Sequence, residues 1–324
     1  MSAGSADSPS VLLVRLDAIG DALTLVPVIA AFRHHAFRIG AVLRPVNAEV
    51  FSSRALDRIH LAGTCSDADL VEEIRSQHYG AALIATEKPE GYRLAYDARI
   101  PARVGFQNGW GKPLKSLWVH RVCTHTLFRT AGLDPRAPHE CEVAFKLART
   151  LLAQPEVPRE PRLLRPFVID DEPAADERVA FQVTDKWQRL GASLEDLAEL
   201  VRRVTARHVV RFIAAEREAG YAGAFTRATG MRVETFAAPA PWKNAIAAAR
   251  AVIAPDSGAA HVAGMVGTPV VSCFARQAFA LQSKRWAPWA APHRVLPIEA
   301  AWPLIAADAL EDLLTGSPQF SYTG

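Results

Sequence analysis

The sequence has few cysteines and no long apolar run. Its 324 residues include four cysteines, Cys65, Cys123, Cys141 and Cys273, and no two of them form a C-x-x-C pair. This spacing suggests neither a zinc site nor a disulfide framework, so reduced thiols are the simplest interpretation. No apolar stretch reaches the roughly 18 residues needed to cross a bilayer, and residues 1–10 lack the basic and apolar regions of an export signal. We therefore expect a cytoplasmic protein.

The sequence also has little excess charge. Its 37 Lys and Arg residues and 34 Asp and Glu residues give a formal net charge of +3. That excess is too small to require nucleic acid, but it is compatible with a phosphate-rich substrate or an anionic membrane surface. Half of the residues are hydrophobic and 22% are charged, a balance that buries an ordinary core.

Two common catalytic motifs are missing. No G-x-G-x-x-G follows the first apolar run, which argues against a nicotinamide or flavin dehydrogenase. No G-x-S-x-G surrounds Ser257, and Ser257 and His261 leave the same predicted helical turn, which argues against a hydrolase.

What the sequence does contain is an alternation of short apolar runs with helical stretches. Residues 11–16 read VLLVRL, as in a buried parallel strand, and residues 22–32 predict the helix that follows. Further strands are predicted at 39–43, 81–86, 103–106, 178–183, 209–214, 232–236, 251–254 and 269–274. Further helices are predicted at 67–77, 140–152, 194–205, 217–229, 243–250 and 259–266.

This alternation and the chain length predict two doubly wound α/β lobes. Five prolines between residues 153 and 173 break regular structure and indicate the connection between the lobes. We expect a disordered tail at 1–10, a first lobe at 11–155, a linker at 156–173, a second lobe at 174–302, and a final helix and tail at 303–324 that cross back to the first lobe.

One strand-to-helix junction has the composition of a phosphate site. Residues 251–261 read AVIAPDSGAAH, an apolar run followed by small residues that let a ligand approach the backbone. The free N–H groups and the positive dipole end of a helix starting near Ser257 would hold a diphosphate without a metal, and His261 lies one turn further on. Taken alone, the segment fits equally well an Asp256 or Ser257 helix cap followed by a half-buried histidine.

Two separated segments resemble glycosyltransferase family 9, the heptosyltransferases. Residues 252–271, VIAPDSGAAHVAGMVGTPVV, are similar to its signature, and residues 11–23, VLLVRLDAIGDAL, are similar to its opening strand and R-x-x-x-x-G-D turn. The resemblance extends thinly over most of the chain. It implies a GT-B fold, two Rossmann-like lobes facing across a cleft, with the acceptor held by the first lobe and a nucleotide sugar by the second. It also implies inverting transfer without a cofactor.

The resemblance assigns roles to particular residues. It makes Asp21 the catalytic base, the residue type needed to accept a proton from an attacking sugar hydroxyl, while Gly20 keeps the turn tight. Asp185-Lys186-Trp187 resembles the family's lysine-tryptophan pair, and Lys186 would neutralise charge on the leaving diphosphate. The donor-binding residues implied are Gly20, Thr184, Lys186, Glu216, Asp256, Ser257, Gly258, Ala259 and His261. Glu218 is a rival to Glu216 for the ribose.

Simpler interpretations stay open for two of these residues. Asp21 also fits an acid in the first turn of a helix, and Lys186 also fits a solvated surface lysine. The sequence Asp67-Ala68-Asp69 matches the metal-binding D-x-D of other glycosyltransferases, but its position favours first-turn helix charges, and no metal is predicted.

The acceptor side departs from the family. Residues 85–92 read ATEKPEGY where family members have an Asp-hydrophobic-Gln segment. The resemblance therefore does not identify the acceptor. A group of basic and aromatic residues fits a pocket for an anionic glycolipid core or a solvated basic loop. Its members are Lys112, Lys115, Arg121 and Arg129, interleaved with Trp110 and Trp118.

The resemblance therefore predicts transfer of a sugar, foremost heptose from ADP-heptose, to a lipopolysaccharide-core or related glycan acceptor. Its partners would be the nucleotide sugar and the glycan, with no nucleic acid, and the family implies peripheral contact with the cytoplasmic face of the inner membrane. A non-catalytic nucleotide-sugar-binding protein and a sugar-nucleotide epimerase of the same fold are the alternatives.

Overall fold

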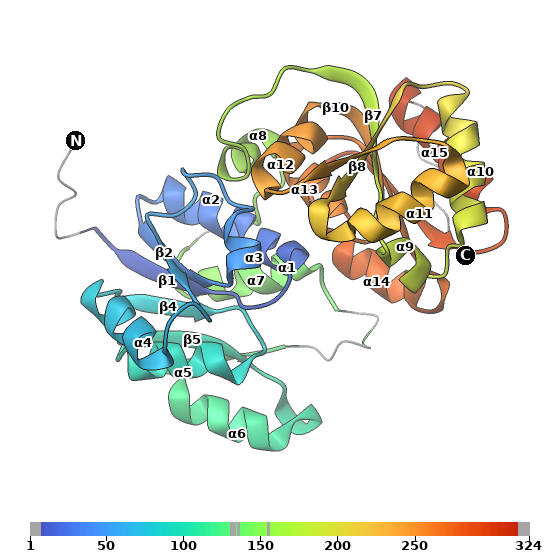
Figure 1. Ribbon diagram of the computed structural model, residues 1–324. Helices are drawn as coiled ribbons and strands as arrows, with labels where there is room; N and C mark the ends of the chain where they lie inside the picture. Colours follow the sequence, from blue (N-terminus) through green and yellow to red (C-terminus); the bar gives the residue numbers. More distant parts are fainter. Residues whose placement is uncertain (1–7, 130–133, 135–136, 154–155, 317–324) are drawn as a thin grey trace. The chain divides into compact units, whose positions relative to one another are not determined.

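The computed structural model describes residues 8–129, 134, 137–153 and 156–316 (Figure 1). The chain divides into two compact units, residues 1–170 and 171–324, called unit 1 and unit 2 below. Of the tail expected at 1–10, residues 1–7 lie outside the described residues, and Ser10 already begins the first strand. Among the described residues, no helix combines the length and the apolar character needed to cross a membrane.

Unit 1 is built on six parallel strands in the order β3-β2-β1-β4-β5-β6. Its strands are β1 (Ser10–Val14), β2 (Arg38–Leu43), β3 (Arg58–Leu61), β4 (Ala81–Ile84), β5 (Ala102–Gln107) and β6 (His125–Phe128). Its α-helices are α1 (Ile19–Leu23), α2 (Val26–His34), α3 (Pro45–Ala48), α4 (Asp67–Ser76), α5 (Pro89–Asp97), α6 (Pro113–Val122), α7 (Glu140–Ala148) and α8 (Pro161–Leu164), and η1 (Gly109–Gly111) and η2 (Arg165–Phe167) are 3-10 helices.

The central strands of unit 1 are apolar because both faces of the sheet are covered. Leu12 and Val14 of β1 pack with the buried side chains of α4, α5 and α6, while α2 packs with α7 and β2. The helix predicted at 67–77 is confirmed as α4, and Asp67 and Asp69 lie in its first turn, where Ser66 caps Asp69 N–H. The D-x-D sequence is thus a helix start, as predicted.

Unit 2 repeats the architecture with the order β12-β11-β10-β7-β8-β9, again all parallel. Its strands are β7 (Asp176–Gln182), β8 (Val210–Ala215), β9 (Val233–Phe236), β10 (Ala249–Pro255), β11 (Val270–Ala275) and β12 (His293–Ile298). Its helices are α9 (Lys186–Arg189), α10 (Leu194–Thr205), η3 (Glu216–Glu218), α11 (Ala219–Thr229), α12 (Pro239–Ala248), α13 (Gly258–Val266), η4 (Arg276–Ala278), α14 (Phe279–Trp286) and α15 (Trp302–Thr315).

In both units the first strand pairs with the fourth. The strand order is that of a doubly wound Rossmann sheet, so the predicted fold class is confirmed. Chain connections leave on opposite sides of the first and fourth strands, which opens a crevice beyond their carboxyl ends. These switch points lie at β1 and β4 in unit 1, and at β7 and β10 in unit 2.

Several local predictions differ from the structure. The helix predicted at 22–32 is two helices, α1 and α2, with the break at residues 24–25. The edge strands β3, β6 and β12 were not predicted, because edge strands are partly exposed and lack a continuous apolar run. Helices α5 and α6 were also missed. Both begin with proline, which breaks a helix interior but is favoured in the first turn.

Part of the predicted linker is helical, and the last helix packs within unit 2. Residues 161–167 form α8 and η2, and Ser52 N–H donates to the Phe167 carbonyl within unit 1. Helix α15 was expected to return to the first lobe. Its buried side chains pack on α10 and on the sheet of unit 2, and Trp302 stacks on Trp187 with ring centroids 5.5 Å apart. Burial of this apolar face in unit 2 is the physical reason.

Gly264 offers a test of the packing of α13. A Cβ atom there would lie 2.7 Å from the Trp289 backbone nitrogen and 3.0 Å from Pro288 Cα, neither of which belongs to a flexible side chain. We expect Gly264→Ala to lower the free energy of unfolding by about 1–3 kcal/mol because of this overpacking. Gly223→Ala in α11 is the control: its nearest neighbour is Arg227 Nη1 at 3.6 Å, so a gain of up to about 1 kcal/mol is expected. Urea unfolding of both variants measures the difference, and a Gly264→Ala protein as stable as the control would contradict this packing.

Candidate functional site

The turn after β1 is organised by a buried arginine. Arg15 follows β1 directly, and its guanidinium donates hydrogen bonds to the Ala85 carbonyl and to Asp21 Oδ1. Ala85 follows β4, so Arg15 joins the two strand ends of the switch point. Asp17 Oδ2 lies 3.4 Å from Arg15 Nε. A cation buried in this way is stabilised only when its donors find acidic or carbonyl partners, and here it finds both.

Asp21 has two roles in the same turn. It is the third residue of α1, and its Oδ2 accepts a hydrogen bond from Ala18 N–H at 3.2 Å, as expected of an acid in the first turn of a helix. Its Oδ1 is held by Arg15, and the side chain is about a quarter exposed. The carboxylate is thus fixed in orientation and still accessible. Gly20 lies beside it as the second residue of α1.

Two further residues hold the turn from neighbouring elements. Asn47 of α3 is fully buried and donates to the Asp17 carbonyl at 3.0 Å, and Lys88 donates to the Leu16 carbonyl at 2.6 Å. Helix α5 also packs tightly here, because a Cβ atom at Gly91 would lie 2.8 Å from Val14 Cγ1. Residues 85–92 therefore support the turn that carries Asp21.

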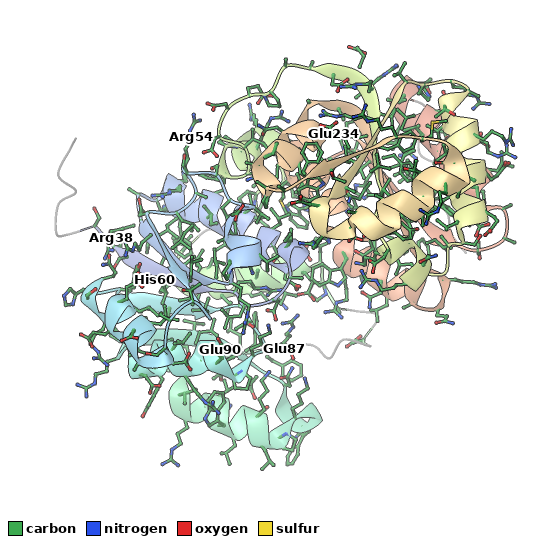
Figure 2. The ribbon with its side chains drawn as sticks, viewed as in Figure 1. Arg38, Arg54, His60, Glu87, Glu90 and Glu234 are labelled. Carbon is green, nitrogen blue, oxygen red and sulfur yellow. The ribbon has the colours of Figure 1, made fainter. Side chains whose placement is uncertain are left out.

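A cluster of opposite charges follows β4. The Glu87 carboxylate lies 3.1 Å from Lys112 Nζ, 3.6 Å from Lys115 Nζ and 3.5 Å from Arg129 Nη1. Arg129 also binds the buried Glu140 at 2.9 Å. Burial raises the pKa of Glu87, but the hydrogen bond from Lys112 and the charges of Arg129 and Lys115 prevail, so its pKa lies below the ordinary value. Figure 2 marks Glu87 just ahead of α5 and Glu90 in its first turn.

The structure separates the basic and aromatic group that the sequence predicts. Lys112, Lys115 and Arg129 gather round Glu87, whereas Arg121 and Trp110 are exposed on α6 and η1. Trp118 packs against Tyr92 with ring centroids 5.7 Å apart and does not join the cluster. A cluster with three cations and one partly exposed carboxylate suits an anionic ligand group that competes with Glu87.

In unit 2, the side chain of Asp256 lies between a lysine and a histidine. It follows β10, and its Oδ2 is 3.4 Å from Lys186 Nζ, while its Oδ1 is 3.7 Å from His261 Nε2. Lys186 is the first residue of α9, which follows β7, and His261 lies in α13. These residues thus meet at the β7–β10 switch point, although they are far apart in sequence. Lys186 is about one-third exposed, and this loose pair leaves its ammonium available to a ligand.

The hydroxyl group of Ser257 bears on ligand binding at this site. It occupies the N-cap position of α13 with an extended backbone, yet its side chain makes no capping hydrogen bond. Within the described part of the chain, its Oγ is buried without a hydrogen-bond partner. Buried hydroxyl groups almost always have a partner, and a ligand at this helix start can supply the one that Ser257 Oγ lacks. The interpretation of Ser257 as only a helix cap does not fit this geometry.

The first turn of α13 leaves room for such a ligand. Gly258 and Ala259 are its first two residues and carry no bulky side chain. The leading N–H groups of a helix have no intrahelical acceptor and lie at the positive end of the helix dipole. Together with Ser257 Oγ and Lys186 Nζ they can bind an anion such as a diphosphate.

The acidic residue tied to this site is Glu218. Its carboxylate accepts a hydrogen bond from Thr184 Oγ1 at 2.9 Å and another from Asp185 N–H at 3.1 Å. Glu216, the residue predicted for the ribose, is exposed at the start of η3. The Thr184 hydroxyl group is therefore already hydrogen-bonded to the Glu218 carboxylate.

The tryptophan of the predicted lysine-tryptophan pair has a structural role. Trp187 is fully buried, stacks on Phe181 and Trp302, and donates from Nε1 to the Gln182 carbonyl at 2.8 Å. The Gln182 side chain in turn accepts from Trp242 Nε1 at 2.9 Å. Fixing Trp187 in the core fixes the backbone of Lys186 at the edge of the site.

The chain is similar to known proteins in part of its sequence and in its fold. The family model described as glycosyltransferase family 9 (heptosyltransferase) matches residues 195–302. These residues include Asp256, Ser257 and His261. The match lies within unit 2, which is similar to a glycosyltransferase family 9 domain over these residues. The resemblance predicted from the sequence is thus confirmed, and with it the activity class, glycosyl transfer. No curated protein matches the sequence.

Solved structures extend the family 9 likeness to the fold of the whole chain. A glycosyl transferase family 9 protein from Veillonella parvula matches with a TM-score of 0.75 and 15% identity, covering 98% of this chain and 100% of that one. E. coli heptosyltransferase WaaC with ADP-2-deoxy-2-fluoro heptose matches with a TM-score of 0.69 and 16% identity, covering 95% and 100%. At these identities the likeness establishes the GT-B fold.

A more distant match shows why fold alone does not define the reaction. The UDP-GlcNAc 2-epimerase from Methanocaldococcus jannaschii has a TM-score of 0.53 and 10% identity, with 96% of this chain and 94% of that one covered. Transfer and epimerisation thus occur on related two-unit scaffolds, and the residues at the switch points must separate them.

Three features of the site were missed from the sequence. Arg15 has a detectable signal, a charged residue at the end of an otherwise apolar run, which indicates a paired cation at a strand end. The bond between Glu218 and Thr184 and the cluster round Glu87 have no such signal, because their members are brought together from separate loops.

The Glu87 cluster predicts a pH-dependent contribution to stability. The pKa of Glu87 lies below its ordinary value of 4.5, so its carboxylate stabilises the fold above that pH, and the contribution is lost as the pH falls through the lowered pKa. We expect Glu87→Gln to lower the free energy of unfolding at pH 7 by less than about 1 kcal/mol, because the group is partly exposed. Urea unfolding along a descending pH series should show this difference shrinking, and a difference that persists at low pH would contradict the electrostatic origin.

Proposed function

We propose that this glycosyltransferase moves heptose from ADP-heptose to an anionic glycan acceptor of the lipopolysaccharide-core type. The donor half of this proposal is supported by the Ser257 Oγ atom at the start of α13, beside Lys186 and Asp256, because this atom has no hydrogen-bond partner among the described residues. The structures with ADP and with an ADP-heptose analogue belong to E. coli WaaC, and the shared fold supports the same donor class here.

The donor diphosphate would lie against the first turn of α13. The N–H groups of Gly258 and Ala259 and the Ser257 hydroxyl donate to its oxygens, and Lys186 neutralises the charge that grows as the glycosidic bond breaks. Asp256 holds the Lys186 ammonium at 3.4 Å before the donor arrives. His261 adds a further donor from the same helix. A carboxylate would accept hydrogen bonds from the ribose hydroxyl groups, and Glu216 and Glu218 are the two candidates. The hydrogen bond from Thr184 to Glu218 favours Glu218.

Asp21 would serve as the general base. Its carboxylate accepts the proton of an acceptor hydroxyl, the hydroxyl oxygen forms a bond to the anomeric carbon, and the carbon–oxygen bond to the diphosphate breaks with inversion. Arg15 supports this role by holding the Asp21 carboxylate in one orientation. A single displacement of this kind uses no cofactor and no metal.

The cluster round Glu87 supports an anionic acceptor. Lys112, Lys115 and Arg129 already gather about one partly exposed carboxylate. A carboxylate or phosphate on the acceptor can replace Glu87 among these cations, and this exchange would select charged glycans over neutral ones.

The role of Asp21 is tested by replacing it with asparagine. Asp21→Asn preserves the shape of the side chain but removes the proton acceptor, so we expect turnover to fall by roughly 10²–10⁴-fold. Binding of the nucleoside diphosphate should change little, because Asp21 lies in unit 1. Release of nucleoside diphosphate with and without a glycan acceptor, together with calorimetric binding, measures both quantities.

The outcomes of this assay are distinct. Retained turnover in Asp21→Asn would rule out the base assignment. Release of nucleoside diphosphate from the wild-type protein without an acceptor would favour an epimerase, and binding without release would favour a non-catalytic nucleotide-sugar-binding protein.

Ser257→Ala separates ligand binding from stability. Since Ser257 Oγ has no partner within the described residues, its removal should leave the unfolding midpoint unchanged. The affinity for ADP should fall by about tenfold or more, because a hydrogen bond to a charged oxygen is lost. Ser193→Ala is the matched control: Ser193 caps α10 through Asp196 N–H, so its loss should lower stability without affecting ADP. Unchanged ADP affinity in Ser257→Ala would show that the diphosphate does not bind at the start of this helix.

A further inference from the structure

The apolar side chains most exposed to solvent gather at one place on unit 1. Among the described residues, the three most exposed large hydrophobic side chains are Trp110 (95%), Leu114 (82%) and Leu117 (72%). Trp110 lies in η1, and the two leucines lie in α6, which follows it directly. Figure 1 shows α6 at the edge of unit 1, next to α5. Single exposed apolar residues are ordinary, but a group of this kind indicates an interaction surface.

Helix α6 is apolar on two faces, and unit 1 covers only one of them. Ser116, Val119 and Val122 are buried on the side that packs against α5 and β5. Leu114 and Leu117 are three residues apart and share another face, which Arg121 continues one turn further on. Because the fold already buries one face, the second apolar face is not needed for the core.

The exposed group continues onto the edge of the sheet. Phe128 ends the edge strand β6 and is 58% exposed. A Cβ atom at Gly109 would lie 3.1 Å from Phe128 Cε2, so the turn that carries Trp110 packs beside this ring. We call Trp110, Leu114, Leu117 and Phe128 the α6 patch. It combines a helix face with the adjoining edge strand.

The charge around the α6 patch is mainly positive, although Lys112, Lys115 and Arg129 pair with Glu87 and Arg129 also pairs with Glu140. Between Asp97 and Asp134 the sequence contains no acidic residue and six Arg or Lys residues. Lys112 and Arg121 are exposed on the two sides of the leucines, as is His120. The whole chain has a net charge of only +3, so this segment concentrates positive charge at the exposed apolar group.

Apolar tips, a tryptophan and a border rich in Lys and Arg are the features of a surface that binds anionic lipid. Tryptophan favours the headgroup level of a bilayer, leucines enter the acyl boundary, and Lys and Arg pair with anionic headgroups. A protein partner can bury the same side chains, so binding to vesicles is the observation that separates the two. We propose that the α6 patch docks unit 1 on an anionic lipid bilayer, with Trp110, Leu114 and Leu117 entering the interface.

This docking goes beyond the proposed reaction and can be tested without turnover. The full chain is sedimented with vesicles of phosphatidylcholine and with vesicles that contain about one third phosphatidylglycerol. We expect binding to the anionic vesicles, weaker binding to the neutral ones, and a loss of affinity at high salt. Equal binding to both kinds of vesicle, or to neither, would overturn the proposal.

Matched variants locate the surface. Leu114→Glu with Leu117→Glu should lower the affinity for anionic vesicles by about tenfold or more, because two apolar anchors are lost and two negative charges are added. Leu163→Glu with Val209→Glu adds the same charge at two other exposed apolar positions, 47% and 70% exposed, and should have a much smaller effect. Equal losses in the two double variants would show that net charge, and not the α6 patch, governs binding.

Two further measurements separate insertion into the bilayer from misfolding and from self-association. Trp110→Phe should remove most of the blue shift in tryptophan emission that anionic vesicles produce, which is expected only if Trp110 leaves water. Circular dichroism and the unfolding midpoint check that each variant is folded. If light scattering shows a wild-type dimer that Leu114→Glu with Leu117→Glu converts to a monomer with unchanged vesicle binding, the α6 patch is a contact between copies and the proposal is wrong.

Discussion

Parallel strands can be joined only by crossover connections, and this constraint determines where both units can bind a ligand. In each sheet the chain moves outward on one side of the first strand and then returns to the other side, so the first and fourth strands become neighbours. Their connections leave a crevice at the carboxyl ends. Arg15 and Asp21 follow β1 in unit 1, while Lys186 follows β7 and Asp256 follows β10 in unit 2. The chemistry proposed for the protein depends on this arrangement of strands.

The charged groups at these positions are compensated in two different ways. Arg15 is buried and donates to both Ala85 and Asp21, so it holds a fixed carboxylate at the strand ends. Lys186 is partly exposed and lies at 3.4 Å from Asp256, a loose contact that a diphosphate can replace. A fixed ion orients a reacting group without further reorganisation, whereas an exchangeable ion can follow the charge of a leaving group.

Two features that bear on the acceptor lie in unit 1. Residues 85–92 place Glu87 among three cations and start α5 at Pro89, which packs against the turn that carries Asp21. The next helix, α6, adds an exposed apolar face with a basic border. The same unit thus combines the candidate base, a site suited to an anionic glycan and a surface suited to anionic lipid, the combination that a glycolipid acceptor requires.

The sequence by itself determined the features that depend on neighbouring residues. Apolar runs such as 11–16 predicted the central strands, Asp67 and Asp69 predicted the start of α4, and residues 252–271 indicated the family. Only the tertiary structure decided which distant groups meet: Glu218 with Thr184, Glu87 with Arg129, and Trp302 with Trp187. It also decided that one apolar face of α6 is buried and the other exposed. The physical reason is that periodicity and capping act within a few residues, whereas pairing of charges and burial depend on how crossovers bring separate loops to one edge of a sheet.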